Sequence, residues 1–99
     1  MINSSKISLR GLRTFCVAAK HQSFRLASEA LFITPSAVSH QIKGLEQELG
    51  QQLFYRNNRD LSLTDIGKSL YDDIRPLIEK LSQVTDSYRA GMVKTSVRI

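Results

Sequence analysis

Apolar side chains recur every three or four residues in three stretches of the first half of the chain, which predicts three short helices. Their expected ranges are 8–20, 25–31 and 35–49. Pro35 suits the first turn of the third helix, because the missing N–H of proline would have no partner there. Gly50 marks the end of that helix. Each helix begins at a hydroxyl side chain that can cap its first free N–H groups, namely Ser8, Ser23 and Thr34.

Beyond this glycine the apolar pattern changes from helical to alternating, and two short strands are expected over 53–56 and 61–63. The Asn-Asn-Arg-Asp segment between them has the composition of a turn and gives the hairpin a basic tip. Thr64 then caps a helix that is expected to extend to about Arg89. Pro76 inside it should bend the helix or cost a backbone hydrogen bond. One side of this helix has apolar residues spaced by four and three: Leu70, Ile74, Leu77, Leu81, Val84 and Tyr88.

Three helices, a hairpin and a long helix predict a mainly α fold, a winged helix-turn-helix followed by a long dimerisation linker helix. The tight link between the second and third helices is the turn of this motif. We therefore expect a flexible N-terminus at 1–6, a winged helix-turn-helix domain at 7–64 with its helix-turn-helix at 24–43 and its wing at 53–63, a linker helix at 65–90, and a hinge at 91–99.

The third helix carries a polar stripe opposite its apolar side. The stripe has the spacing i, i+3, i+4, i+7 and consists of Ser36, Ser39, His40 and Lys43. Small side chains in the first turn let a helix enter the DNA major groove, which is about 12 Å wide. Lys43 is long enough to reach the DNA backbone or a base edge. A solvated face of an ordinary amphipathic helix would have the same spacing, so the spacing alone leaves both interpretations open.

Charge and helix starts indicate where phosphate groups would bind. Lys and Arg number 14 against 9 Asp and Glu, which gives a net charge of +5. Most of it lies before Thr64, and free N–H groups at helix starts also favour phosphate. For the two wing arginines the alternative is a surface charge that keeps a short edge strand soluble. The residues expected on phosphate or in the minor groove are Ser23, Arg25, Thr34, Arg56 and Arg59.

The apolar side of the last helix predicts a homodimer. A helix of this length cannot bury its far half against so small a domain, and the matching helix of a second copy is the simplest cover. We therefore expect dimerisation through the residues from Leu70 to Tyr88.

Several classes of protein are excluded by the residue types. The single cysteine, Cys16, allows no internal disulfide and no cysteine-based zinc site, and we expect it to pack as a small hydrophobe. A carboxylate pair, a metal-ligand set and a phosphate-binding loop are all missing, so an enzyme is not expected. No apolar run suits a membrane span or a signal peptide, which favours the cytoplasm. The phenylalanines are expected in the core: Phe15, Phe24, Phe32 and Phe54.

Two stretches, LRTFCVAAKHQSFRLASEALFITPSAVSHQIKGLEQELGQQLF and LSLTDIG, resemble the DNA-binding domain of LysR-type bacterial transcriptional regulators. The resemblance covers 9–67, and the long helix fits the linker helix of the family. The segment SAVSHQIKGLE is most similar to the branch that includes the glycine-cleavage regulator. Two positions depart from the family pattern: Pro35 stands where many members have Gln, and His40 where many have Arg. Since Gln and Arg are strong base readers, Ser36, Ser39 and His40 are left to read bases, and Pro35 to contact a thymine methyl.

The resemblance implies properties that the pattern itself does not show. Members of the family are longer, with a C-terminal effector-binding domain, and they act as dimers or tetramers on imperfect inverted repeats of double-stranded DNA. The chain would then be a DNA-binding fragment whose final residues, SVRI, begin the effector domain. No cofactor is expected in this fragment, a small-molecule effector is expected for the missing domain, and RNA polymerase is a further candidate partner.

Two other functions are weighed against sequence-specific DNA binding. A non-specific architectural protein would bind random DNA with similar affinity and give no consensus on selection. A protein-interaction or dimerisation module would bind its partner with an affinity that ignores salt and competing DNA. The basic wing and the small polar stripe favour DNA.

Overall fold

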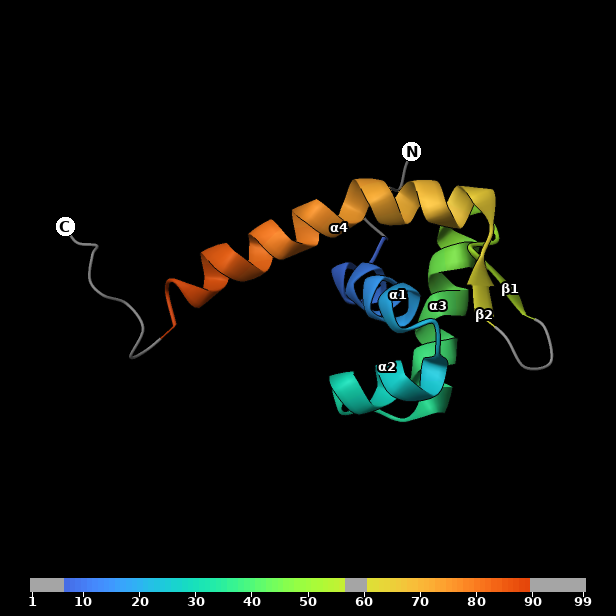
Figure 1. The fold of residues 1–99 in the computed structure, drawn as a ribbon, viewed down its shortest axis with the longest axis horizontal. Coiled ribbons are helices and arrows are strands. Elements are labelled where there is room, and N and C mark those ends of the chain that lie inside the picture. The colour runs from blue at the N-terminus through green and yellow to red at the C-terminus, as the bar shows by residue number, and fades with distance from the viewer. Residues whose placement is uncertain (1–6, 57–60, 90–99) are drawn as a thin grey trace.

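The structure is a computed structural model and describes residues 7–56 and 61–89. Three helices come first, then a two-stranded antiparallel wing, then a long helix (Figure 1). The mainly α fold expected from the sequence is therefore confirmed. The elements are α1 (Leu9–His21), α2 (Phe24–Leu31), α3 (Pro35–Leu49), β1 (Phe54–Arg56), β2 (Leu61–Leu63) and α4 (Asp65–Asp86). The assignments made for 1–6, for the hairpin tip at 57–60 and for 91–99 lie outside the described residues.

All four expected helix starts are confirmed by side-chain caps. In each, a hydroxyl oxygen accepts a hydrogen bond from the backbone N–H three residues further on. The four bonds are Gly11 N to Ser8 Oγ at 3.2 Å, Leu26 N to Ser23 Oγ at 3.0 Å, Ala37 N to Thr34 Oγ1 at 3.0 Å, and Gly67 N to Thr64 Oγ1 at 2.9 Å. At the other end of α3, Gly50 adopts a left-handed conformation with φ of 68°, as expected of a residue that follows a helix.

The core lies where α1, α2, α3 and the base of the wing meet, and α4 packs against it. Its largest fully buried side chains are Phe15, Phe54, Ile42, Leu53 and Val38. The Phe15 and Phe54 rings meet edge to face with centroids 5.6 Å apart, and Phe24 meets Phe54 in the same way at 5.8 Å. Such pairs add to the stabilisation that comes from burial alone.

Cys16 packs into this core as a small hydrophobic residue, as expected. Burial raises the pKa of its thiol to about 11, although the nearby Arg75 acts in the opposite direction. The thiolate, which is the reactive form of cysteine, is therefore scarce at neutral pH.

Phe32, expected in the core, lies on the surface. Phe32 is 93% exposed, so its assignment to the core was wrong. It is the residue after α2, and its backbone is left-handed with φ of 59°, at the point where the chain turns toward α3. The position of Phe32 in that turn, and not its residue type, sets the direction of the side chain. Leu49, the last residue of α3, is exposed as well.

Replacing Phe32 by glycine is expected to stabilise the domain by up to about 1 kcal/mol, since glycine adopts φ of 59° without steric cost. The exposed ring loses almost no packing in the exchange. Thermal unfolding of Phe32→Gly should therefore shift upward by a few degrees. The matched control is Ala30→Gly, at an exposed position inside α2, which should lower stability by about 1 kcal/mol. A drop in the unfolding temperature of Phe32→Gly would contradict the strain argument.

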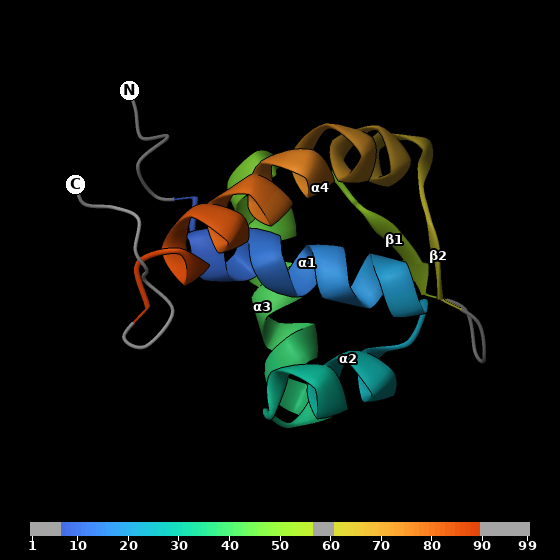
Figure 2. The same ribbon diagram turned by 60° about the vertical axis from the view of Figure 1, so that its left-hand side comes forward.

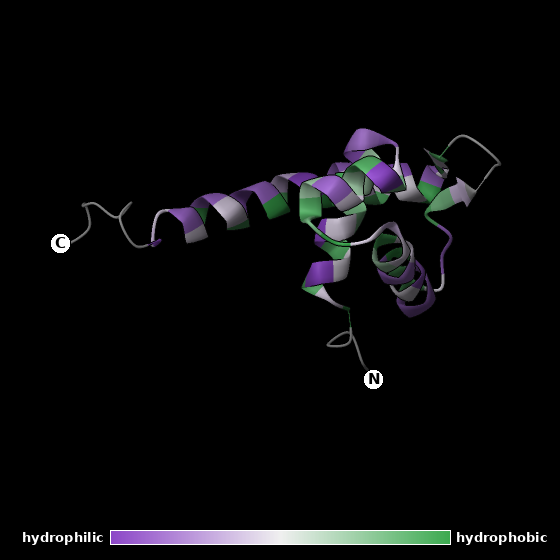
Figure 3. Ribbon diagram, turned by 90° about the horizontal axis from the view of Figure 1, so that it is seen from below, coloured by the Kyte–Doolittle hydropathy of each residue, from purple (hydrophilic) through white to green (hydrophobic). Residues whose placement is uncertain are grey.

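The long helix α4 packs on the domain with its first half and the turn that follows Pro76. Partly buried Leu70, Tyr71, Ile74 and Ile78 face the core, and Figure 2 shows α4 passing over α1. Pro76 lies inside α4, and in Figure 1 the second half of the helix departs from the direction of the first and projects from the domain. Figure 3 shows apolar and polar residues mixed along this projecting part.

The helix ends at Asp86, three residues before the expected end. Backbone bonds from Tyr88 N to Thr85 O and from Arg89 N to Asp86 O, both spanning three residues, close a turn there. Within the described part of the chain, no helix combines the length and apolar character that crossing a membrane would require.

Candidate nucleic-acid interface

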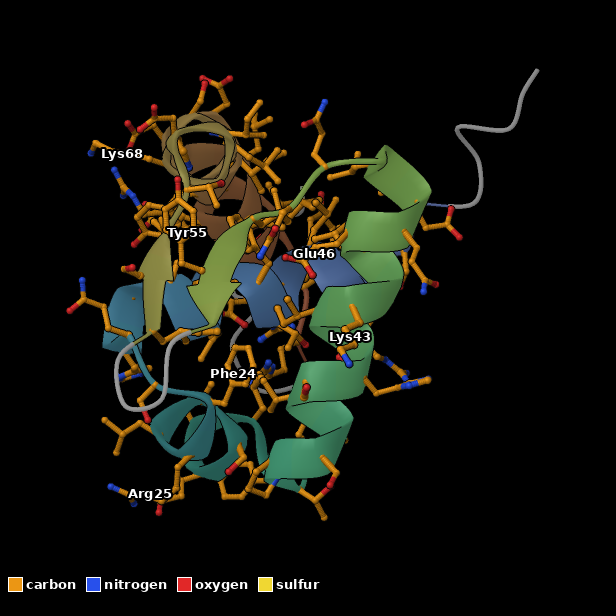
Figure 4. The ribbon with its side chains drawn as sticks, turned by 90° about the vertical axis from the view of Figure 1, so that its right-hand side faces the viewer. Phe24, Arg25, Lys43, Glu46, Tyr55 and Lys68 are labelled. Carbon is orange, nitrogen blue, oxygen red and sulfur yellow. The ribbon has the colours of Figure 1, made fainter. Side chains whose placement is uncertain are left out.

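The first turn of α3 and the whole of α2 lie at the end of the domain opposite α4 (Figure 1). The wing strands run beside α3, and β1 pairs with β2 so that Phe54 lies opposite Leu63 (Figure 4). The start of α3 and α2 therefore lie at one end of the domain, the wing runs beside α3, and α4 lies at the other end.

The structure brings most of the polar stripe of α3 to the surface. Ser36, His40 and Lys43 are exposed, whereas Ser39 is half-buried. The opposite side of α3 is anchored in the core by the fully or nearly fully buried Val38, Ile42 and Leu45. Pro35 and Thr34 are exposed at the start of the helix, next to the stripe. The exposed face has small side chains first and a long cation about two turns later, an arrangement that fits a major groove.

Lys43 is available as a cation. It is exposed, and within the described residues it forms no ion pair. Figure 4 shows it on α3 between the start of the helix and the wing. It can therefore contact an anion without first leaving an acidic partner.

Arg25 differs from Lys43 in this respect. Its Nη1 lies 2.8 Å from Glu29 Oε2, one turn along α2. Both side chains are exposed, so the pair contributes little to stability and can open when a phosphate group approaches. Ser23 and Thr34 use their hydroxyl oxygens as helix caps, and each hydroxyl keeps its hydrogen for donation.

The wing arginines are only partly described. Arg56 is the last residue of β1, and Arg59 lies outside the described residues. Their proximity to DNA therefore stays a prediction from the sequence.

Glu46 has a role that the sequence analysis missed. Its Oε2 accepts hydrogen bonds from Leu53 N at 2.7 Å and Phe54 N at 3.3 Å, which join α3 to the start of β1. Figure 4 shows Glu46 in the space between α3 and the wing strands. Hydrogen bonds from a carboxylate to backbone N–H groups seven and eight residues further on leave no local pattern in the sequence.

The start of the wing is also tied to α4. Thr64 donates its hydroxyl to Gln52 O at 2.7 Å, and Thr64 N donates to Leu53 O at 3.0 Å. Gly67, in the first turn of α4, lies so close that a Cβ on it would be 2.0 Å from Leu53 O. The helix α3, the wing and α4 thus meet at the backbone of residues 52–54.

The residues expected at a dimer interface divide into two groups. Leu70 and Ile74 pack against the core of their own domain. The other four form an exposed apolar strip on the projecting part of α4 and the turn after it: Leu77 (61% exposed), Leu81 (45%), Val84 (45%) and Tyr88 (78%). Leu81 also lines a shallow groove between α1 and α4, together with Leu9 and Ile78.

The described residues contain no cluster of three or more His, Cys, Asp or Glu side chains that could hold a metal ion. His40 stands on an exposed helix face.

Comparison with known proteins identifies the family. The family model "Bacterial regulatory helix-turn-helix protein, lysR family" matches residues 9–68. The glycine cleavage system transcriptional activator of Escherichia coli K12 is 45% identical over 91 residues, which are 92% of this chain and 30% of that protein. The chain thus spans less than a third of the length of this relative.

Solved structures agree with this result. The DNA-binding domain of BenM in complex with benA site 1 DNA superposes with a TM-score of 0.75 at 32% identity, covering 89% of this chain and 99% of that one. The full-length virulence activator AphB of Vibrio cholerae gives a TM-score of 0.79 at 30% identity, covering 82% of this chain and 28% of that one. The family is one of transcriptional regulators and not of enzymes. The chain belongs to the LysR family of bacterial regulatory helix-turn-helix proteins, and its described residues form the DNA-binding domain of that family.

Proposed function

We propose that this domain reads a specific sequence of double-stranded DNA as a dimer, with α3 in the major groove and the wing on the backbone or in the minor groove. The observation that carries the proposal is the exposed stripe of Ser36, His40 and Lys43 on a helix whose other side is locked in the core. The similar DNA-binding domain of BenM is solved in complex with DNA, which supports DNA as the ligand of this domain.

Base reading is assigned to the first two turns of α3, and phosphate binding to the helix starts and the wing. Pro35, Ser36, Ser39 and His40 would face base edges, with serine and histidine as hydrogen-bonding groups and proline as an apolar contact. The phosphate contacts would come from Ser23, Arg25, Thr34, Lys43, Arg56 and Arg59. These contacts supply affinity that falls steeply with salt, whereas the base contacts supply sequence choice.

The test is a selection from random duplex DNA with the purified chain, repeated at two salt concentrations. An inverted-repeat consensus is expected, with half-sites one helical turn or a multiple apart. Enrichment without a consensus would overturn the proposal in favour of non-specific architectural binding. Failure to enrich DNA at either salt concentration would indicate a protein-interaction module.

Lys43→Ala is expected to weaken binding to all sequences alike, because a phosphate contact carries no base information. The slope of log affinity against log salt should flatten by about one unit. Fluorescence anisotropy on the selected site and on a scrambled duplex, over a range of salt, measures both quantities. A changed consensus with an unchanged slope would assign Lys43 to a base instead.

The dimer is proposed to form through the exposed strip of α4, from Leu77 to Tyr88. Two domains joined in this way place two recognition helices on successive turns of one face of the DNA. We further propose a bacterial cytoplasmic location and RNA polymerase as a partner. A small-molecule effector is assigned to the part of such regulators that this chain does not span.

A further inference from the structure

The first strand of the wing begins at a carboxylate of the recognition helix. Glu46 Oε2 accepts from the backbone N–H groups of Leu53 and Phe54, at 2.7 and 3.3 Å. The side chains of both residues are fully or almost fully buried, so this stretch of backbone is held from two directions. Bonds to a charged acceptor are stronger than those to a neutral one.

Glu46 also lies close to the surface proposed to bind DNA. It stands one turn beyond Lys43 on α3 (Figure 4), and the two line the same shallow hollow with Gln47 and Gln52. A carboxylate near DNA repels phosphate, so electrostatics alone would favour its removal. Its hydrogen bonds to the wing provide the opposing advantage.

We infer that Glu46 is a positioning residue for DNA binding, which fixes the wing relative to the recognition helix by holding the N–H groups of Leu53 and Phe54. The inference rests on the proposed function, since it assumes that both α3 and the wing contact DNA. Arg56 is two residues beyond Phe54 on the same strand, so the place of Arg56 along the DNA depends on this anchor. Glu46 itself makes no base or phosphate contact in this scheme.

The test compares Glu46→Ala with Glu48→Ala on the selected duplex. Both variants remove one negative charge from the last turns of α3, but the side chain of Glu48 is exposed and forms no hydrogen bond or ion pair with another described residue. Glu48→Ala should bind DNA as well as the unmodified chain or more tightly. Glu46→Ala should bind about tenfold more weakly, with a flatter salt dependence, because the proposed phosphate contact of Arg56 is lost. Glu46→Gln keeps an acceptor oxygen and should restore most of the affinity.

A double-mutant cycle with Arg56→Ala separates positioning from general loss of structure. In the Arg56→Ala background, adding Glu46→Ala should change the Kd by no more than about twofold, because the contact through which Glu46 acts is already absent. Hydroxyl-radical footprints of Glu46→Ala should keep the protection by α3 and lose that by the wing. Equal, additive effects in both backgrounds, or a gain in affinity like that of Glu48→Ala, would overturn the inference. Failure of the unmodified chain to bind any duplex would instead reject the proposed function.

Discussion

Gly67→Ala is expected to lower the free energy of unfolding by about 3 kcal/mol or more, because the added methyl group has no room. Its carbon would lie 2.0 Å from Leu53 O and 2.9 Å from Leu53 C, both atoms of the backbone. Leu53 cannot easily move away. Its side chain is fully buried, its N–H is bound by Glu46, and its carbonyl accepts from Thr64 N. To make room for the methyl group, α4 and the backbone at Leu53 must move apart.

For a domain of this size, such a loss corresponds to a fall in the unfolding temperature of about 12 °C or more. Thermal unfolding followed by circular dichroism measures it. Gly44→Ala is the matched control. Gly44 lies inside α3, and a Cβ on it would meet no atom within 4 Å other than those of its own stretch of helix. Alanine is the better helix former, so Gly44→Ala should gain up to about 1 kcal/mol. If the unfolding temperature of Gly67→Ala stayed within a few degrees of that of the unmodified chain, the prediction would be wrong, and α4 could move away from the backbone of Leu53 at little cost.

Helix starts were predictable from the sequence because a cap is a local device. A hydroxyl side chain bonds an N–H group three residues further on, so the pattern needs no knowledge of the rest of the fold. Ser8, Ser23, Thr34 and Thr64 all behave in this way. Periodicity likewise located the buried side of α3 and therefore the exposed stripe opposite it.

Residues whose roles depend on turns were less predictable. Residue type placed Phe32 in the core, but a left-handed backbone after α2 directs its side chain to solvent. Glu46 acts across the turn that follows Gly50, on N–H groups seven and eight residues away. Its hydrogen-bond partners cannot be predicted until the path of the chain through that turn is known.

Gly67 did carry a sequence signal. Glycine is a poor helix former, so a glycine in the first turn of a predicted helix suggests a close approach of another backbone. The structure identifies that backbone as residue 53. The apolar spacing of the last helix was less informative than this glycine. The spacing predicted a single dimer interface, whereas Leu70 and Ile74 pack on their own domain and Leu81 does not.

Leu81→Glu is expected to convert the proposed dimer to monomers with little effect on the fold of the monomer. Leu81 is 45% exposed, so a charged side chain can reach water from the single domain. In the dimer the same charge would be covered by apolar side chains without a partner, at a cost of several kcal/mol. A cost of about 2.8 kcal/mol already corresponds to a hundredfold weaker association.

Sedimentation and DNA binding together test this expectation. Leu81→Glu should sediment as a monomer and bind the selected inverted repeat at least about a hundredfold more weakly, while its affinity for a single half-site stays the same. Gln83→Glu is the control, because it adds the same charge at an exposed position about 200° around the helix from Leu81. It should remain dimeric.

The half-site measurement decides what a loss of affinity means. If Leu81→Glu weakened half-site binding as much as inverted-repeat binding, the substitution would have damaged the domain, and the strip from Leu77 to Tyr88 would not be its dimer contact. If the variant stayed dimeric, the contact would lie elsewhere on the chain. If the strip is covered in the dimer and exposed in the monomer, Leu81→Glu should give a monomer whose affinity for a half-site is unchanged. The reason is that the first turn of α3, which is proposed to read bases, lies at the end of the domain opposite α4.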